Sequence, residues 1–236
     1  MSAGSPAQAA PFSWDDIRLA VFDVDGTLYR QSTLRLRMAR DMLIHAVRSA
    51  SWTHIKVLSA YRRLREELGD AETDAFEPIL VERTAAASGA TPDQVRAVVA
   101  EWMEEQPLPH LDRCRYAGLP ALFDGLRAQG RAIGILSDYP VESKLESLGL
   151  FFDHAVWAGE PEVGILKPHP RGLQRLMDLA EAEPSRTVLI GDRAERDGLA
   201  AQRAGAHALI RSDKPLPGWT TFRRFDDPLF APMLTT

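Results

Sequence analysis

Two aspartates separated by one residue follow a short apolar run near the start of the chain. The run Leu19–Phe22 leads into Asp23 and Asp25, and the pair Gly26-Thr27 comes next. Three interpretations fit: a turn, because Asp-Gly is a common turn pair, a calcium loop, or a catalytic pair of carboxylates. The calcium loop fails, because an EF-hand needs glycine at position 6 and glutamate at position 12. Counted from Asp23, glycine stands at position 4 and Leu34 at position 12.

Three further apolar runs also end in polar residues that could serve a reaction. They lie at residues 132–136, 187–190 and 206–210, and they lead into Ser137-Asp138, Gly191-Asp192 and Arg211-Ser212. Continuous apolar runs are typical of strands buried on both faces, as in parallel sheets. Ligands bind at the carboxyl ends of such strands, so we expect these polar endings to converge on one site.

The segments between these runs carry the spacing of helices. Apolar residues recur three or four positions apart within 119–126, 141–148 and 173–180. Strand alternating with helix predicts an α/β fold with a doubly wound, mainly parallel, Rossmann-like sheet. The C-terminal segment around residues 219–230 carries aromatic residues and proline, and we expect it to pack back on this core.

Residues 32–111 follow a different pattern. They contain no convincing strand and several helical patterns, and Pro92 after Thr91 suits the first turn of a helix. We therefore predict an all-helical cap at 32–111, inserted into a core formed by 14–31 and 112–236. Residues 1–13 are predicted to be a flexible N-terminal tail.

Bulk composition excludes several classes of protein. The chain has 236 residues, of which 45% are hydrophobic and 26% charged, a normal globular balance. A net charge of −5 gives no reason to expect binding to nucleic acid or to an acidic membrane. The single cysteine, Cys114, rules out an internal disulfide and fits a reducing compartment. No apolar run reaches the length of a membrane span and the N-terminus does not resemble a secretory signal, so we expect a cytoplasmic monomer or homodimer.

The polar endings together resemble the motifs of a known family. Asp23-Val-Asp25-Gly-Thr27 is similar to the first motif of the haloacid dehalogenase-like (HAD) phosphatase superfamily. Ser137 matches the second motif, Lys167 in Leu-Lys-Pro-His-Pro the third, and Asp192 with Asp197 the fourth. The resemblance covers about residues 17–212, and the helical insertion falls where many members carry a cap domain. It implies a Mg²⁺-dependent phosphatase that acts on a small phosphorylated metabolite.

The resemblance also implies roles for the catalytic residues. Asp23 would be the nucleophile that forms an aspartyl-phosphate, and Asp25 would move protons for the leaving group and for water. One carboxylate cannot easily do both, because the nucleophile and the acid need opposite protonation states. Phosphate esters are anionic, so the attack also needs positive charge, which Lys167 and a magnesium ion would supply.

Further residues would hold the phosphate and the metal. By the same resemblance, Ser137 and the main chain of Asp138 bind the phosphoryl group, and Thr27 supports the loop beside it. Asp138 stands where many relatives have asparagine. Magnesium would be bound by Asp23, by the main-chain carbonyl of Asp25 and by Asp192. Asp197 would orient Lys167 or a metal-bound water.

Other outcomes of the same motifs stay open at this point. Displacing a halide needs no proton donor, so the presence of Asp25 argues against a dehalogenase. Phosphosugar mutases use the same four motifs, and a non-catalytic scaffold that binds a phosphorylated ligand is a third alternative. The cap arginines are interpreted as a solvated helical face from which a minority could reach a polyanionic substrate; they are Arg35, Arg37, Arg40, Arg62, Arg63 and Arg65.

Overall fold

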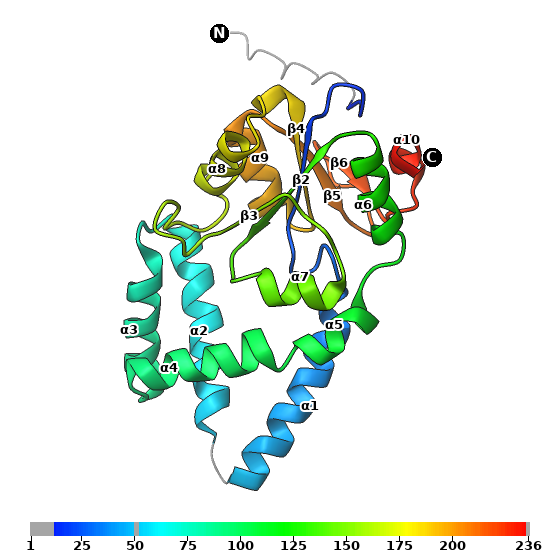
Figure 1. Cartoon of the computed structure of the whole chain (residues 1–236). Helices are drawn as coiled ribbons and strands as arrows, with labels where there is room; N and C mark the ends of the chain where they lie inside the picture. Colours follow the sequence, from blue (N-terminus) through cyan, green and yellow to red (C-terminus); the bar gives the residue numbers. More distant parts are fainter. Residues whose placement is uncertain (1–11, 50–51, 235–236) are drawn as a thin grey trace.

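A six-stranded parallel sheet forms the centre of the computed structural model, which describes residues 12–49 and 52–234 (Figure 1). The strand order is β3-β2-β1-β4-β5-β6. The strands are β1 Leu19–Phe22, β2 Ala132–Ser137, β3 His154–Trp157, β4 Thr187–Gly191, β5 His207–Arg211 and β6 Thr220–Phe222. Strand β1 is central, and its last residue, Phe22, is in register with Ile135 of β2 and Ile190 of β4.

Side chains of the sheet alternate between two apolar cores. Ala20 and Phe22 of β1 belong to one core, and Leu19 and Val21 belong to the other, because successive side chains of a strand point to opposite faces. The first core is covered by α6 (Leu119–Ala128), α7 (Glu142–Leu148) and α10 (Ala231–Leu234). The second is covered by α8 (Arg171–Leu179) and α9 (Leu199–Ala204).

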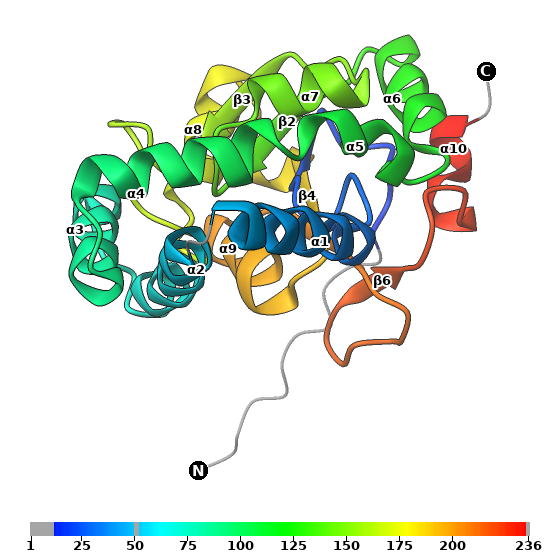
Figure 2. The ribbon, with the colours of Figure 1, turned by 90° about the horizontal axis from the view of Figure 1, so that it is seen from below.

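Helices fill the described part of the chain between β1 and β2. Before α6 they are α1 (Gln31–Ser49), α2 (Thr53–Asp70), α3 (Phe76–Ser88), α4 (Pro92–Val99) and α5 (Leu108–Cys114), with a π-helical stretch at Ala100–Glu105. Figure 1 shows α1 to α4 gathered below the sheet, beyond the end where β1 leads into α1. Figure 2, seen from below, accordingly places α1 and α2 between the viewer and the sheet. The expected start of a helix at Pro92 is confirmed, since Thr91 and Gln94 form a capping box around it.

The predicted fold class is confirmed, and two strands are added to it. The sheet is parallel throughout, with helices on both faces and a helical insertion after the first strand. Strand β3 was not predicted, because its four residues start with a histidine and only Val156 is fully buried. Strand β6 lies in the C-terminal segment, whose residues Phe222, Phe225 and Phe230 are buried in the core as expected.

The division into tail, core and cap stays a prediction. Residues 1–11 of the predicted tail lie outside the described residues. Helix α5 runs across the predicted boundary at residue 111. Within the described residues, none of the helices combines the length and the apolar character that a membrane span requires.

Candidate active site

The carboxyl edge of the sheet brings the predicted site residues together. Asp23 directly follows β1, and its N–H donates to the carbonyl of Ile190 on β4 at 2.9 Å. Ser137 ends β2, and Asp192 directly follows β4. The parallel register thus places three of the four predicted motifs side by side at the edge that faces the cap.

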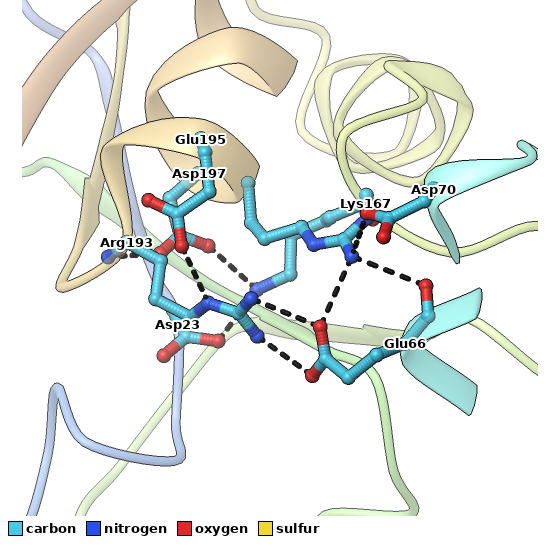
Figure 3. A network of polar contacts seen from close by, with 8 residues as sticks. Asp23, Glu66, Asp70, Lys167, Arg193, Glu195 and Asp197 are labelled. Atoms are coloured by element: carbon cyan, nitrogen blue, oxygen red, sulfur yellow. Dashed lines mark hydrogen bonds and ion pairs between the residues drawn. The ribbon is translucent and has the colours of Figure 1, made fainter. Parts of the chain in front are cut away.

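Asp23 lies in a buried network with a lysine and a second aspartate. It is 7% exposed, and one of its carboxylate oxygens, Oδ1, accepts a hydrogen bond from Lys167 Nζ at 2.5 Å (Figure 3). Lys167 Nζ also donates to Asp197 Oδ1 at 2.7 Å. The other oxygen of Asp197 accepts from the N–H of Arg193 at 3.0 Å. Lys167 therefore bridges the first and the fourth motif.

Three carboxylates of this network could share one cation. Ligand oxygens of Asp23, Asp192 and Asp197 lie within 4.8 Å of one another. Asp192 Oδ1 is buried and has no hydrogen-bond partner. An unpartnered buried oxygen is costly unless a ligand satisfies it. These residues therefore fit a hard divalent cation, which prefers carboxylate oxygens.

The electrostatics of the cluster point the same way. Burial, together with the charges of Asp197 and Asp192, raises the pKa of Asp23 well above its ordinary value, although Lys167 opposes the shift. Burial and Asp197 raise the pKa of Asp192 to about 6. Burial disfavours the charge of Lys167, but Asp197 and Asp23 raise its pKa well above the ordinary value. One buried lysine does not balance three carboxylates, and a cation would supply the missing charge.

Asp25 lies in a separate environment two residues farther along the chain. Both of its carboxylate oxygens are 3.2 Å from Lys144 Nζ, and Oδ1 also accepts a hydrogen bond from the Tyr29 hydroxyl. Burial alone would raise the pKa of Asp25, but Lys144 and Tyr29 outweigh burial and hold it below the ordinary value. The side chain of Asp25 is not part of the three-carboxylate cluster.

Lys144 was not predicted from the sequence. It is 5% exposed and lies on α7, in a helical pattern that indicated packing through Leu145 and Leu148 only. A lone lysine in such a helix gives no signal of its own. Lys144 lies in the first turn of α7, shortly after β2 ends at Ser137, and from there it contacts Asp25.

The predicted phosphate-binding residues lie at different depths. Thr27 is fully buried, and its hydroxyl donates to Asp23 Oδ2 at 2.9 Å, so Thr27 supports Asp23 and does not line the cavity. Ser137 is buried, and its hydroxyl accepts from the N–H of Tyr139 at 3.1 Å. Asp138 lines the cavity, and its Oδ1 is buried without a hydrogen-bond partner.

A cavity of about 390 Å³ opens above this edge of the sheet. Its wall includes Asp23, Asp25, Lys167 and Asp192 from the core and Arg65 from the cap. Its size falls within the range of small-molecule sites, about 300–1,000 Å³. A second, more apolar cavity adjoins it: Asp25 and Tyr139 line both, and cap side chains that include Leu34, Met38 and Trp102 complete its wall.

Fold and site together define an α/β enzyme whose helical insertion covers a carboxylate-rich site at the end of a parallel sheet. Residues 17–205 match the family model of the haloacid dehalogenase-like hydrolases, so the chain belongs to this hydrolase family. The predicted family and the prediction that the chain is an enzyme are thereby confirmed.

Individual relatives cover the chain to different extents. Pyrophosphatase PpaX of Bacillus mycoides (strain KBAB4) is 35% identical over 92 residues, which are 37% of this chain and 41% of PpaX. The chain thus aligns with less than half the length of this relative.

Solved structures match nearly the whole chain, at low identity. The HAD hydrolase YfnB of Bacillus subtilis, solved with magnesium bound, has a TM-score of 0.65 and 16% identity, covering 88% of this chain and 95% of YfnB. The 2-haloacid dehalogenase of Pseudomonas syringae pv. Tomato DC3000 has a TM-score of 0.61 and 19% identity, covering 89% and 95%. At these identities the similarity shows the fold, and the chemistry has to be argued from the site.

Proposed function

We propose that this chain is a Mg²⁺-dependent phosphatase that hydrolyses a small phosphate monoester through an aspartyl-phosphate on Asp23. The observation that carries the proposal is the buried network in which Lys167 Nζ contacts both Asp23 and Asp197, with Asp25 two residues away in its own ion pair. The network provides a nucleophile, a fixed cation and a second carboxylate of different basicity.

In the first half of the reaction, an oxygen of Asp23 forms a bond to phosphorus while the bond between phosphorus and the leaving oxygen breaks. Lys144 keeps Asp25 ionised in the resting site. The arrival of a dianionic phosphate nearby raises the proton affinity of Asp25, because like charges disfavour the ionised form, and Asp25 takes up a proton from solvent. Lys167 offsets negative charge on the phosphoryl oxygens, and Asp25 gives this proton to the leaving alkoxide.

In the second half, Asp25 takes a proton from water, and the water oxygen attacks phosphorus. The bond between phosphorus and Asp23 breaks, which releases inorganic phosphate and restores the carboxylate. Thr27 holds Asp23 through Oδ2 during both halves. Magnesium held by Asp23, Asp192 and the main-chain carbonyl of Asp25 would add charge compensation for the phosphoryl oxygens; Asp197 lies close enough to join this set.

The environment of Asp25 favours phosphate transfer over dehalogenation. A halide leaves without a proton, so a dehalogenase has no use for a second carboxylate aligned at the site. Here Asp25 is held by two dedicated partners, Lys144 and Tyr29. The fold similarity to a 2-haloacid dehalogenase therefore does not extend to the proposed chemistry.

The test is release of phosphate from p-nitrophenyl phosphate with and without Mg²⁺. We expect turnover that is abolished by a chelator and by Asp23→Asn. The control variant Asp124→Asn changes an exposed residue of α6 and should behave as the wild type. The intermediate can be identified with a phosphate ester whose phosphoryl group is radiolabelled. We expect the wild-type protein to retain the label in acid and the Asp23→Asn protein to carry none. A phosphorylated Asp23→Asn protein would overturn the nucleophile assignment. Transfer to a sugar phosphate without release of phosphate would indicate a mutase.

A further inference from the structure

Arg65 is a buried cation without a carboxylate partner. It is 6% exposed, whereas Arg62 and Arg63 on the same helix are exposed. Among the described residues, no carboxylate oxygen lies within 4.0 Å of the Arg65 guanidinium, the distance that defines an ion pair. The Nη2 atom of Arg65 is buried without a hydrogen-bond partner. The sequence-based interpretation of Arg65 as part of a solvated face is therefore wrong. Arginine is almost never fully buried unless it is paired, so this position lacks an anion.

Aromatic rings hold the guanidinium in place. It lies 3.8 Å from the ring centroid of Tyr139 and 5.2 Å from that of Phe76, and Nη1 donates to the Tyr61 hydroxyl at 3.4 Å. The nearby acids Asp138 and Glu77 attract it from beyond ion-pair distance. Rings orient a cation but do not neutralise it, so the group is fixed in direction and still carries uncompensated charge.

Arg65 lines the same cavity as the catalytic carboxylates. Among the other cations in that wall, Lys167, Arg193 and Arg196 are in ion pairs with carboxylates. Arg35 is exposed on α1. Arg65 is thus the buried, unpaired cation of the cavity among the described residues.

The ring of Tyr139 places Arg65 on the side of the leaving group. Arg65 lies over this ring at 3.8 Å from its centroid, and Lys144 Nζ lies 5.2 Å from the same centroid. Lys144 in turn holds Asp25, the group proposed to protonate the leaving oxygen. Lys167 lies at Asp23, on the side of the transferred phosphoryl group. The two cations therefore serve different parts of one substrate.

We propose that Arg65 binds a second anionic group of the substrate, a carboxylate or a phosphate carried by the leaving group. This proposal rests on the phosphatase function proposed above, because it takes Asp23 and Lys167 as the site of the transferred phosphoryl group. A planar guanidinium can make two parallel hydrogen bonds to either anion. The enzyme would thereby select phosphate esters whose leaving group carries a second anion over esters whose leaving group is uncharged.

A matched series of two-carbon esters tests the selection. The Mg²⁺-loaded enzyme is assayed with 2-phosphoglycolate, with ethylene glycol bisphosphate and with 2-hydroxyethyl phosphate, whose leaving group is uncharged. We expect kcat/KM to be higher for at least one doubly anionic ester, and Arg65→Gln to lower that value about 10- to 100-fold, the size of a lost charge-assisted hydrogen bond. The kcat/KM for 2-hydroxyethyl phosphate should not change in Arg65→Gln. The ester whose kcat/KM falls in Arg65→Gln shows whether the second anion is a carboxylate or a phosphate. An equal fall in kcat/KM for all three esters would overturn the proposal.

A binding measurement separates this proposal from the phosphatase proposal. Titration calorimetry compares phosphonoacetate, which carries a phosphonate and a carboxylate, with ethylphosphonate, which lacks the second anion. We expect tighter binding of phosphonoacetate by the wild type and loss of that difference in Arg65→Gln. If p-nitrophenyl phosphate is not turned over but this difference exists, the phosphatase proposal fails alone. Equal binding of both phosphonates by the wild type, together with equal kcat/KM for the three esters, would refute the second-anion site.

Two further variants guard against a purely structural effect. Arg83→Gln removes an exposed arginine from α3, which lines none of the cavities described above, and should change nothing. Arg65→Lys keeps the charge without the fork geometry, so it should retain part of the preference for the doubly anionic ligand. Thermal unfolding shows which variants are folded. Two results for a folded Arg65→Lys protein would contradict the assignment. One is the full wild-type preference for the ligand with a second anion. The other is no preference at all, combined with equally weakened binding of the ligand that lacks the second anion.

Discussion

Two aspartates of one loop acquire opposite properties from their partners. Asp23 lies with two other carboxylates around Lys167, and its pKa is raised by burial and by those neighbours. Asp25 lies against Lys144 and Tyr29, which hold its pKa below the ordinary value in spite of burial. Apart from Tyr29, the side chains that cause this difference are more than a hundred residues away in the sequence. The difference fits the proposed roles of Asp23 as nucleophile and Asp25 as proton carrier.

At the residue scale, Lys144 is predicted to position Asp25. Lys144→Met removes the ion pair and leaves a buried carboxylate with the Tyr29 hydroxyl alone, so its orientation and its charge both change. We expect kcat to fall by up to about 10²-fold, within the range that general acid–base catalysis contributes. KM should change little, because Lys144 does not touch the phosphoryl site.

The matched variant Lys144→Arg keeps the charge and should recover most of the lost turnover. The pH dependence of kcat supplies a second readout. Because Lys144 lowers the pKa of Asp25, its removal should shift the acidic limb of the profile to higher pH. A Lys144→Met enzyme with wild-type kcat and an unmoved profile would remove Lys144 from the mechanism.

At the scale of the elements, the loops after β1 and β4 pack so closely that a side chain at Gly26 would clash with Asp192. Gly26 has φ +105°, and a Cβ atom at this position would lie 2.2 Å from Asp192 Oδ2. The glycine thus serves two needs: a backbone conformation that favours glycine, and close approach to a proposed metal ligand.

Gly26→Ala is therefore predicted to impair metal binding. We expect weaker Mg²⁺ affinity by calorimetry and a loss of turnover, because the new methyl group must displace the carboxylate of Asp192. Gly89→Ala is the matched control: Gly89 also has a positive φ, +74°, but a Cβ there meets nothing within 4 Å. Both variants should lose about 1 kcal/mol of stability. Equal Mg²⁺ affinity in the two would argue against Asp192 as a ligand.

Much of this edge of the sheet could be predicted from the sequence, because it depends on local pattern. Apolar runs that end in aspartate or serine indicate parallel strands whose endings converge, and Asp23, Ser137 and Asp192 do converge. Lys144 and Arg65 could not be found in this way, since their roles depend on which helix packs over which strand. Arg65 did carry a signal that was not used. It lies four residues after Tyr61 and three before Leu68, on the apolar stripe of α2.

At the scale of the whole molecule, ion pairs join the helical insertion after β1 to residues that follow β3 and β4. Arg193 and Arg196, which follow β4, contact Glu66 of α2 at 2.9 and 3.0 Å, and Arg196 also contacts Asp70 at 2.5 Å (Figure 3). Arg203 contacts Glu72 at 2.7 Å, and Arg171 contacts Asp74 at 2.6 Å. The acidic end of α2 and the turn after it therefore rest on basic residues of the core.

Glu66→Gln should weaken this contact in a way that depends on pH. Hydrogen bonds from Arg193 lower the pKa of Glu66 in the folded protein. Its contribution is therefore present above the unfolded pKa of about 4.3 and is lost as the pH falls through the lower folded value. Since Glu66 is half exposed, we expect at most about 1 kcal/mol in the free energy of unfolding.

Urea unfolding of wild type and variant checks this expectation. The difference between the two should be constant near neutral pH, shrink as the pH falls below about 4.3, and fall with added salt. Glu67→Gln is the control, because Glu67 pairs only with the exposed Arg63 on its own helix. A difference that is the same for both variants, or independent of pH, would rule out a contribution from the cap–core pairs.

The central place of β1 in the sheet has a consequence for the order in which the protein is assembled. During synthesis β1 leaves the ribosome first, but its two neighbours are residues 132–137 and 187–191. The helices between β1 and β2, whose contacts with one another are local, are all complete before either neighbour exists. Closing such long loops costs entropy that only the finished sheet repays. The strand that leads into both aspartates is therefore the first strand of the described sheet to be made and cannot be paired on both sides until residue 191 has emerged.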